Sequence, residues 1–406
     1  MRWFIFIIFL LLTQFYVFQA IKTVTNNKIL FGIYLSFVFI VYGILIYYFF
    51  TRFSGFTNSM EYFIGFFLAL SFFQLILLSV VFLEDIIRFF QFLFSFSKNN
   101  LNYDKTSFPQ RRKFISQAAI ILASIPFSAI LFGMYKGKYN YKVLSYDLEF
   151  DDLPSSFDGF KITQISDLHS GSFDNPKKVE YGLNLVNDQK SDLILFTGDI
   201  VNNKTKELLP WVKLFSALKA PYGIFSVLGN HDYGDYTNWE NKEAKKANMD
   251  LMFSTQEKMG WKLLNNDSVY LDKNGEKIAI VGVENWGKGR FKKAGDLNKS
   301  VEKISKKDFK ILLTHDPSHW DAEVLKHKHK FHLTLSGHTH GFQFGIEIPG
   351  FFKWSPSQWQ YKQWAGIYKK NNQFLNVNRG FGYLAYPGRV GIWPEITVIT
   401  LRKSKL

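Results

Sequence analysis

The 406-residue sequence contains no cysteine, and its first third carries very little charge. The lack of cysteine excludes disulfide bonds and metal sites built on thiolates, but it does not identify the cellular compartment. Histidine is also absent from the first 168 residues, and all nine histidines follow them. Any metal chemistry that uses imidazole therefore belongs to the later part of the chain.

Charge is distributed unevenly along the chain. Residues 1–134 contain ten Lys or Arg and four Asp or Glu, whereas the rest contains 39 and 30, and the whole chain has a formal net charge of +15. A basic chain favours anionic partners such as phosphoesters or acidic lipid, although net charge says nothing about the fold. The later part of the chain has the composition of an ordinary globular domain.

Four uncharged apolar stretches of 19, 23, 22 and 22 residues dominate residues 1–136. They cover about 3–21, 29–51, 62–83 and 114–135. Each is long enough to cross a bilayer, which takes about 20 helical residues. None has an ionisable residue in its interior, which argues against a transporter and predicts an all-α four-helix transmembrane anchor. The first stretch can also be interpreted as a cleaved signal peptide, because Arg2 gives it a positive start.

Basic residues between these stretches predict the orientation of the anchor. Six of them fall in the loop 84–113, namely Arg88, Lys98, Lys105, Arg111, Arg112 and Lys113. The loop 52–61 has only Arg52. Since basic loops stay in the cytoplasm, we expect a multi-pass protein of the cytoplasmic membrane whose residues 137–406 are extracytoplasmic. Three lysines at 136, 138 and 142 lie on the other flank and oppose this orientation.

The run from Gln110 to Ile115 permits a second interpretation. Its arginine pair, followed by Lys113, Phe114 and an apolar segment, resembles a twin-arginine export signal, which moves folded proteins out of the cytoplasm. Alternatively, the two arginines only anchor the end of a helix. Both interpretations place residues 135–406 outside the cytoplasm.

Beyond residue 136 the sequence alternates between predicted strands and helices, which is typical of an α/β domain. Seven apolar runs predict strands at 161–165, 193–197, 223–228, 278–283, 310–314, 331–336 and 396–401. Three polar-apolar segments predict helices at 176–189, 206–218 and 239–259. Polar residues directly follow five of the strands, and this edge of an α/β sheet is where ligands bind.

The residues that follow these five strands are of types that bind metal ions. They are Asp167 and His169; Asp199; Asn230, His231 and Asp232; His315; and His338 and His340. Imidazole nitrogen and carboxylate oxygen suit divalent Mn, Fe and Zn. The spacing in Asp-x-His and His-x-His turns both side chains of a pair to one side of an extended segment. Glycines at 198, 229 and 337 precede the candidate ligands and permit close approach of the backbone.

In this order, the motifs Asp-x-His, Gly-Asp, Gly-Asn-His-Asp, a single His and Gly-His-x-His resemble those of the calcineurin-like metallophosphoesterases, over about residues 140–402. The segments 378–380 and 394–396 are similar to those of a membrane-associated bacterial subgroup. The resemblance implies an α/β fold in which two sheets form a sandwich flanked by helices. Asn202 departs from the pattern, because many relatives have an acidic residue there, and this puts in doubt only the surroundings of the ligands.

The resemblance also implies a role for each motif residue. The first metal ion would be held by Asp167, His169 and His340, the second by Asn230, His315 and His338, and Asp199 would bridge them. His231 would contact the substrate phosphate, and Asp232 would orient its imidazole. Two divalent ions, Mn, Fe or Zn, would lower the pKa of a bridging water, and the hydroxide would attack phosphorus in line with the leaving oxygen. His231 would stabilise charge or protonate the leaving group.

The sequence therefore predicts a metal-dependent phosphoester hydrolase at the membrane, whose substrate can be lipid-linked. No nucleic-acid partner is expected. One alternative is a hydrolase of the pyrophosphate in UDP-2,3-diacylglucosamine, a lipid A precursor, which would need a domain that faces the cytoplasm. Another is a non-catalytic metal-binding membrane sensor or scaffold, which the complete ligand set disfavours.

Three histidines in a basic run, His327, His329 and His332, match no motif, and we expect a solvated turn there. His319 is expected to be an ordinary residue at a helix start.

The aromatic stretch 351–368 mixes Trp354, Trp359 and Trp364 with lysines, which suits a membrane interface or a packed loop, and nucleic-acid stacking less well. Because it follows Gly-His-x-His, it should border the site. The helix predicted at 239–259 is expected to be solvated, with a partial lid as the alternative.

Overall fold

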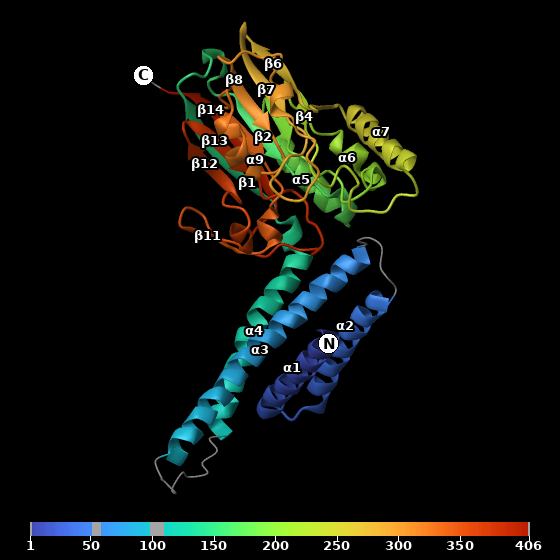
Figure 1. The fold of residues 1–406 in the computed structure, drawn as a ribbon, viewed down its shortest axis with the longest axis vertical. Helices are drawn as coiled ribbons and strands as arrows, with labels where there is room; N and C mark the ends of the chain where they lie inside the picture. Colours follow the sequence, from blue (N-terminus) through green and yellow to red (C-terminus); the bar gives the residue numbers. More distant parts are fainter. Residues whose placement is uncertain (1, 51–57, 98–108, 405–406) are drawn as a thin grey trace. The chain divides into compact units, whose positions relative to one another are not determined.

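The computed structural model describes residues 2–50, 58–97 and 109–404. By their contacts the residues form two compact units (Figure 1). Met1–Phe53 and Tyr62–Phe132 form a helical unit, whereas Ser54–Glu61 and Gly133–Leu406 form an α/β unit. The last turn of the fourth helix therefore belongs with the α/β unit, and the domain boundary at 136/137 stays a prediction.

The helical unit consists of long apolar helices. They are α1 (Arg2–Val24), α2 (Lys28–Phe50), α3 (Asn58–Ser97) and α4 (Pro109–Tyr135). Three contain segments long and apolar enough to cross a membrane, at Lys28–Tyr48, Ser59–Phe94 and Gln110–Tyr135. The segment Ile8–Val24 of α1 is apolar but shorter. These helices carry fewer than one charged residue per turn. Their surface is therefore mostly apolar and suits contact with lipid.

The third helix is much longer than the predicted span 62–83. It has 40 residues, because the charges at 84 and 85 interrupt the apolar run without breaking the helix. Arg88 therefore lies on α3, and the prediction of one loop over 84–113 is wrong. Lys98 and Lys105 lie outside the described residues.

A polar cluster joins three helices inside the apolar unit. The Tyr34 hydroxyl donates to Gln14 Oε1 at 2.9 Å, and Gln74 Nε2 donates to the Tyr34 hydroxyl at 2.9 Å. The Tyr42 hydroxyl donates to Gln74 Oε1, also at 2.9 Å. Because an unpaired polar group is costly in hydrocarbon, such bonds hold α1, α2 and α3 together.

The α/β unit contains two six-stranded sheets. The first has the order β1 (Lys142–Phe150), β14 (Glu395–Lys403), β2 (Lys161–Ile165), β3 (Leu193–Phe196), β4 (Ile224–Ser226) and β5 (Trp261–Leu263). The second has the order β12 (Gly366–Lys370), β13 (Gln373–Val377), β9 (Leu333–Ser336), β8 (Phe309–Leu313), β7 (Glu276–Gly282) and β6 (Asp267–Lys273). A separate hairpin pairs β10 (Ile346–Ile348) with β11 (Phe352–Trp354).

Alternating side chains of β3 explain why this strand is apolar throughout. Leu193 and Leu195 pack between the sheets, together with Ile311 and Leu335 of the second sheet. Ile194 and the neighbouring Phe196 face the other way, toward the helices. A strand covered on both faces reads as a continuous apolar run. This arrangement confirms the predicted α/β sandwich of two sheets flanked by helices.

Helices cover the outer faces of the sandwich (Figure 1). They are α5 (Pro176–Asp188), α6 (Val212–Phe215), α7 (Lys242–Lys258), α8 (Leu297–Ser300) and α9 (Ser318–Ala322). The helix predicted at 206–218 is wrong, since α6 has four residues and short 3-10 turns precede it. Pro210 lacks the backbone N–H that a continuous helix would use.

Candidate metal centre

The candidate ligands leave the ends of strands in both sheets. Those of the first sheet follow β2, β3 and β4, and those of the second follow β8 and β9. All five of these strands are central and parallel to a neighbour in their sheet. The carboxyl ends of parallel strands meet at one edge, which is why residues 167 to 340 converge.

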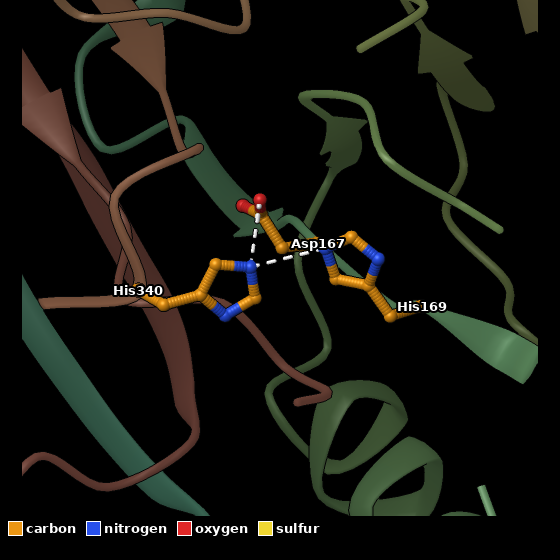
Figure 2. A group of neighbouring side chains, drawn as sticks. All are labelled: Asp167, His169 and His340. Atoms are coloured by element: carbon orange, nitrogen blue, oxygen red, sulfur yellow. Dashed lines mark hydrogen bonds and ion pairs between the residues drawn. The ribbon is translucent and has the colours of Figure 1, made fainter. Parts of the chain in front are cut away.

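One cluster joins Asp167, His169 and His340 (Figure 2). The Nε2 atoms of the two histidines lie 3.1 Å apart, and His340 Nε2 lies 3.2 Å from Asp167 Oδ1. All three side chains are buried. Three ligand-type atoms therefore point at one place inside the domain.

A second cluster joins Asp199, His315 and His338. His315 Nε2 lies 3.0 Å from Asp199 Oδ2 and 3.2 Å from His338 Nδ1. Asp199 Oδ2 also lies 3.6 Å from His169 Nε2, an atom of the first cluster. One carboxylate thus lies beside both groups.

The spacing of these atoms fits divalent metal ions. Atoms that share an ion at about 2.1 Å lie roughly 3.0–3.4 Å from one another in octahedral or tetrahedral geometry. Two of the separations in each cluster are 3.0–3.2 Å. Asn230, predicted as a further ligand, has a buried Oδ1 without a hydrogen-bond partner among the described residues. Its Nδ2 donates to the Tyr236 hydroxyl at 2.9 Å, which fixes the amide.

The backbone at this site is strained where it presents the ligands. Five candidate ligands have positive φ angles, at 52° for Asp167, 47° for His169, 60° for Asp199, 71° for His338 and 50° for His340. Such a conformation costs about 1–3 kcal/mol for a residue with a side chain, and it concentrates at functional sites. The backbone conformation that directs these side chains therefore lowers the stability of the folded domain.

Two glycines let the backbone come close to the carboxylates. A Cβ on Gly229 would lie 2.2 Å from Asp199 Oδ1, and a Cβ on Gly337 would lie 2.2 Å from Asp167 Oδ2. Both distances are far below van der Waals contact. The glycines seen in the sequence are thus required by packing against the ligands.

The carboxylates of the centre are held in the charged form. Burial by itself raises their pKa values, but His340 lowers the pKa of Asp167 and His315 lowers that of Asp199. For His315, burial lowers the pKa, yet the Asp199 carboxylate raises it to about 10. Asp167 and Asp199 therefore offer charged carboxylate oxygens to a cation.

His231 and Asp232 lie at the centre, but not as expected. The Asp232 carboxylate accepts backbone N–H groups from residues 199–201 and 229, at 2.8 to 3.3 Å. The His231 ring instead donates through Nδ1 to the Asn202 carbonyl at 2.7 Å. Asp232 therefore shapes the loop that carries Asp199, and the predicted contact between Asp232 and the imidazole is not present.

Comparison with known proteins identifies the family. A model described as "Calcineurin-like phosphoesterase" matches residues 160–342, and one described as "Probable Calcineurin-like phosphoesterase, transmembrane domain" matches residues 1–138. The uncharacterized metallophosphoesterase YkuE of Bacillus subtilis is 32% identical over 255 residues, which cover 62% of this chain and 82% of YkuE. The chain belongs to the calcineurin-like metallophosphoesterases.

Two further relatives show how widely the match extends. An uncharacterized metallophosphoesterase of Aquifex aeolicus is 27% identical, over 68% of this chain and 98% of its own length. A transmembrane protein with metallophosphoesterase domain from Danio rerio is 25% identical, over 68% of this chain and 60% of its own. The chain is thus a membrane protein with a phosphoesterase domain from a family that uses divalent metals.

Two residues outside the motifs contact histidines of this metallophosphoesterase centre, and one of them, Tyr361, lies in the aromatic stretch expected to border the site. Arg389 is buried, donates to the carbonyl oxygens of Gly380 and Gly382, and brings Nη2 to 3.2 Å from His340 Nδ1. The Tyr361 hydroxyl lies 2.7 Å from His338 Nε2. Neither residue lies in a recognised motif, and only the fold brings it to its histidine.

Asn202 lies between His231 and the carboxylate of Glu207. Its backbone N–H donates to Glu207, whose carboxylate also accepts from Asn203 and Lys204. Its carbonyl is then free to accept from His231. Glu207 therefore fixes the backbone that presents the Asn202 carbonyl to His231.

The remaining histidines lie outside the two ligand groups. His329 and His332 are buried, so the predicted solvated turn is wrong for both. His332 Nε2 lies 2.8 Å from Asp152, which compensates its burial. His319 is also buried, between Thr314 and Glu323, and it has a structural position at the start of α9.

Proposed function

We propose that this protein hydrolyses phosphoesters with two divalent metal ions bound at the two clusters. The observation that carries the proposal is the pair of buried Asp/His groups on either side of Asp199. One ion would be held by Asp167, His169 and His340, and the other by Asn230, His315 and His338. Asp199 would contribute to both.

The bound ions would supply hydroxide at neutral pH and neutralise the phosphoryl oxygens. The protein itself would position the metal ligands. The Tyr361 hydroxyl can accept the outer ring N–H of His338, and Asp232 holds the loop of Asp199 through four backbone N–H groups. Arg389 lies beside His340 and holds the Gly380 and Gly382 carbonyl oxygens. Partners of this kind fix the direction of a ligand and tune its basicity.

His231 supplies a proton-exchanging group beside the clusters. Its ring centre lies 4.9 Å from that of His169, and its Nδ1–H is committed to the Asn202 carbonyl. Nε2 is then the ring nitrogen that gives or takes a proton. A protonated Nε2 would stabilise the phosphoryl charge or protonate the leaving oxygen.

A basic loop next to the centre favours an anionic substrate. Phe291 packs against His338 with ring centres 4.9 Å apart. The exposed cations around it are Lys288, Arg290, Lys292 and Lys293. Positive charge at the mouth of a site attracts phosphoesters and speeds their encounter.

The catalytic region comprises residues 137–406, with the anchor in 1–136, and we place the catalytic region outside the cytoplasm. Support comes from the basic residues Arg111, Arg112 and Lys113 at the start of α4 and from Arg88 near the end of α3. All four flank the same connection between two apolar helices.

The test uses the full-length chain in lipid nanodiscs, freed of metal and then supplied with Mn, Fe or Zn. A panel of soluble aryl phosphomonoesters, aryl phosphodiesters and a pyrophosphate would be offered. We expect turnover of at least one class that depends on added metal. Tight binding of metal without turnover of any class would contradict the proposal and support the sensor or scaffold alternative.

A further inference from the structure

In the hairpin of β10 and β11, the charged side chains face the protein and the apolar side chains face outward. An ordinary surface hairpin has the opposite arrangement. The pairs across it are Ile346 with Trp354, Glu347 with Lys353, and Ile348 with Phe352. Since side chains alternate along a strand, the middle pair faces one way and the two outer pairs face the other. The hairpin therefore has one charged face and one apolar face.

The charged face is turned into the protein. Glu347 Oε1 accepts from the buried Arg379 at 2.6 Å. Lys353 donates to the Ala365 carbonyl at 2.5 Å, and its Nζ lies 4.8 Å from the centre of the Tyr368 ring. These bonds fix which side of the hairpin faces outward.

The apolar face is turned out. Ile346 and Ile348 are 56% and 52% exposed, Phe352 is 49% exposed, and Phe351 at the turn is 86% exposed. Trp359 is 77% exposed and packs edge-on against Trp354. A contiguous apolar patch of this kind marks a binding surface, because a soluble protein would bury or replace it.

This patch is attached directly to the metal centre. The turn His340–Gln343 (η7) contains a candidate ligand and ends three residues before β10. On the other side of the hairpin, the Ser355 hydroxyl donates to the Gly341 carbonyl at 2.6 Å. The position of the hairpin and the position of His340 are therefore linked by short, bonded segments.

The same patch is also attached to the place where the chain leaves the anchor. Arg389 N–H donates to the carbonyl of Gly133 in the last turn of α4 at 3.3 Å. The adjacent Val390 pairs with Phe344, and Gly345 N–H donates to the Val390 carbonyl at 2.9 Å. The segment 389–390 thus bonds on one side to the end of α4 and on the other to the residues that lead into the hairpin.

We propose that the apolar face of the hairpin 346–354, together with Trp359, is seated in the interface of the lipid bilayer. The occupant follows from the chain itself, because α4 contains the candidate membrane span Gln110–Tyr135 and ends beside this hairpin. Aromatic residues with lysines are the side chains that membrane interfaces favour. The hairpin then holds the mouth of the metal centre at the headgroup level. The substrate class is a phosphoester of a membrane lipid, and this part rests on the proposed function.

The seating is tested with the full-length chain, which has no native cysteine. A single Phe351→Cys variant would carry an environment-sensitive fluorophore in nanodiscs with headgroup-level spin-labelled lipid. Glu257→Cys near the end of α7, on another side of the domain in Figure 1, is the matched control. We expect a blue shift and about twofold or greater quenching at 351, and neither at 257. A blue shift without lipid quenching would mean a protein contact and overturn the proposal, as would a water-exposed label.

The substrate class is tested with Phe351→Ser/Phe352→Ser in the full-length chain. We expect hydrolysis of a phosphoester lipid in the bilayer to fall about tenfold or more, because the two aromatic side chains that seat the hairpin in the membrane interface are lost. Hydrolysis of a soluble aryl phosphoester should stay unchanged, which also shows that the variant is folded. Equal loss on both substrates, or on neither, would overturn the lipid assignment. Absence of any turnover in the parent chain would contradict the proposed function, while the quenching result would still decide the seating.

Discussion

Asp199 is the residue on which both metal groups depend. Its Oδ2 lies 3.0 Å from His315 Nε2 and 3.6 Å from His169 Nε2, so one carboxylate oxygen approaches both clusters. The other oxygen accepts the backbone N–H of His231 at 2.8 Å. A carboxylate in this position can neutralise two cations at once.

Replacing Asp199 with alanine should remove both metal ions and lower turnover by roughly 10³-fold or more, because metal ions supply several kcal/mol of charge stabilisation. Elemental analysis of the purified chain, together with turnover, measures both effects. Asp188→Ala at the exposed end of α5 is the control for removing a carboxylate. Two tightly held metals per chain in the Asp199 variant would show that it is not a shared ligand.

His231→Gln should leave the metal content unchanged and lower turnover by roughly 10²–10⁴-fold, the range for loss of a general acid. The reason is that the ring bonds to the Asn202 carbonyl through Nδ1 and belongs to neither ligand group. The measurement compares substrates with good and poor leaving groups. An equal rate on the poor leaving group would exclude His231 from proton transfer.

At this scale the sequence predicts residue types better than it predicts contacts. The motif residues could be found because Asp-x-His and Gly-His-x-His place ligands at fixed offsets from strand ends. Arg389 could not, because it lies 49 positions from His340 in the sequence and only the fold brings the two together. The Asp232 carboxylate was assigned to an imidazole, whereas four nearer backbone N–H groups bind it.

The loops after the strands are elements whose shape is set by glycine. In the loop after β4, Gly229 has no room for a methyl group, because a Cβ would lie 2.2 Å from Asp199 Oδ1. Gly223, before the same strand, has φ +89° but nothing within 4 Å of a built Cβ. One glycine is therefore required by contact and the other by conformation.

Gly229→Ala should lower metal affinity about tenfold or more and destabilise the domain by about 1–3 kcal/mol, the cost of an overpacked site. Metal titration and thermal unfolding measure the two effects. Gly223→Ala should cost stability alone, since it strains the backbone away from the ligands. Weaker metal binding in both variants would mean that strain, and not contact with Asp199, sets the affinity.

The helices of the anchor are held by the polar cluster around Gln74. Gln74→Leu should lower the stability of the helical unit by about 1 kcal/mol, the typical worth of such bonds in a membrane. Unfolding of the full-length chain in lipid, followed by helix content, measures it. Gln117→Leu on an exposed part of α4 is the matched control and should not destabilise. An intact mass that lacks α1 would show that Gln14 is removed as part of a signal peptide.

Elements were predictable where one periodicity dominates over many residues. The buried runs of β2, β3, β7, β8 and β9 were recognised from their apolar residues. The short strands β10 and β11 were not, because their alternation is inverted and their apolar side chains point outward. The end of α3 was missed because charges at 84 and 85 mark the edge of an apolar run, which is not the edge of a helix.

For the whole molecule, the order of motifs predicts the fold, whereas the side of the membrane depends on a few charges. We expect the α/β unit to be extracytoplasmic, so a phosphatase reporter that works only outside the cytoplasm should be active when fused after Leu406. Protease should reach the domain while the cytoplasmic membrane is sealed. Protection that ends only when this membrane is broken would contradict the topology. It would also favour a nucleotide-linked substrate made inside the cell, such as UDP-2,3-diacylglucosamine.

The last turn of α4 has a consequence for any attempt to separate the enzyme from the membrane. A Cβ on Gly133 would lie 2.7 Å from the Arg389 carbonyl, and one on Gly137 would lie 2.3 Å from it, so both glycines are packed against the segment that carries Arg389. Shedding by a protease that cuts after Tyr135 would uncover this segment and loosen the support of His340. A soluble form that keeps its activity should therefore retain the turn from residue 133 onward.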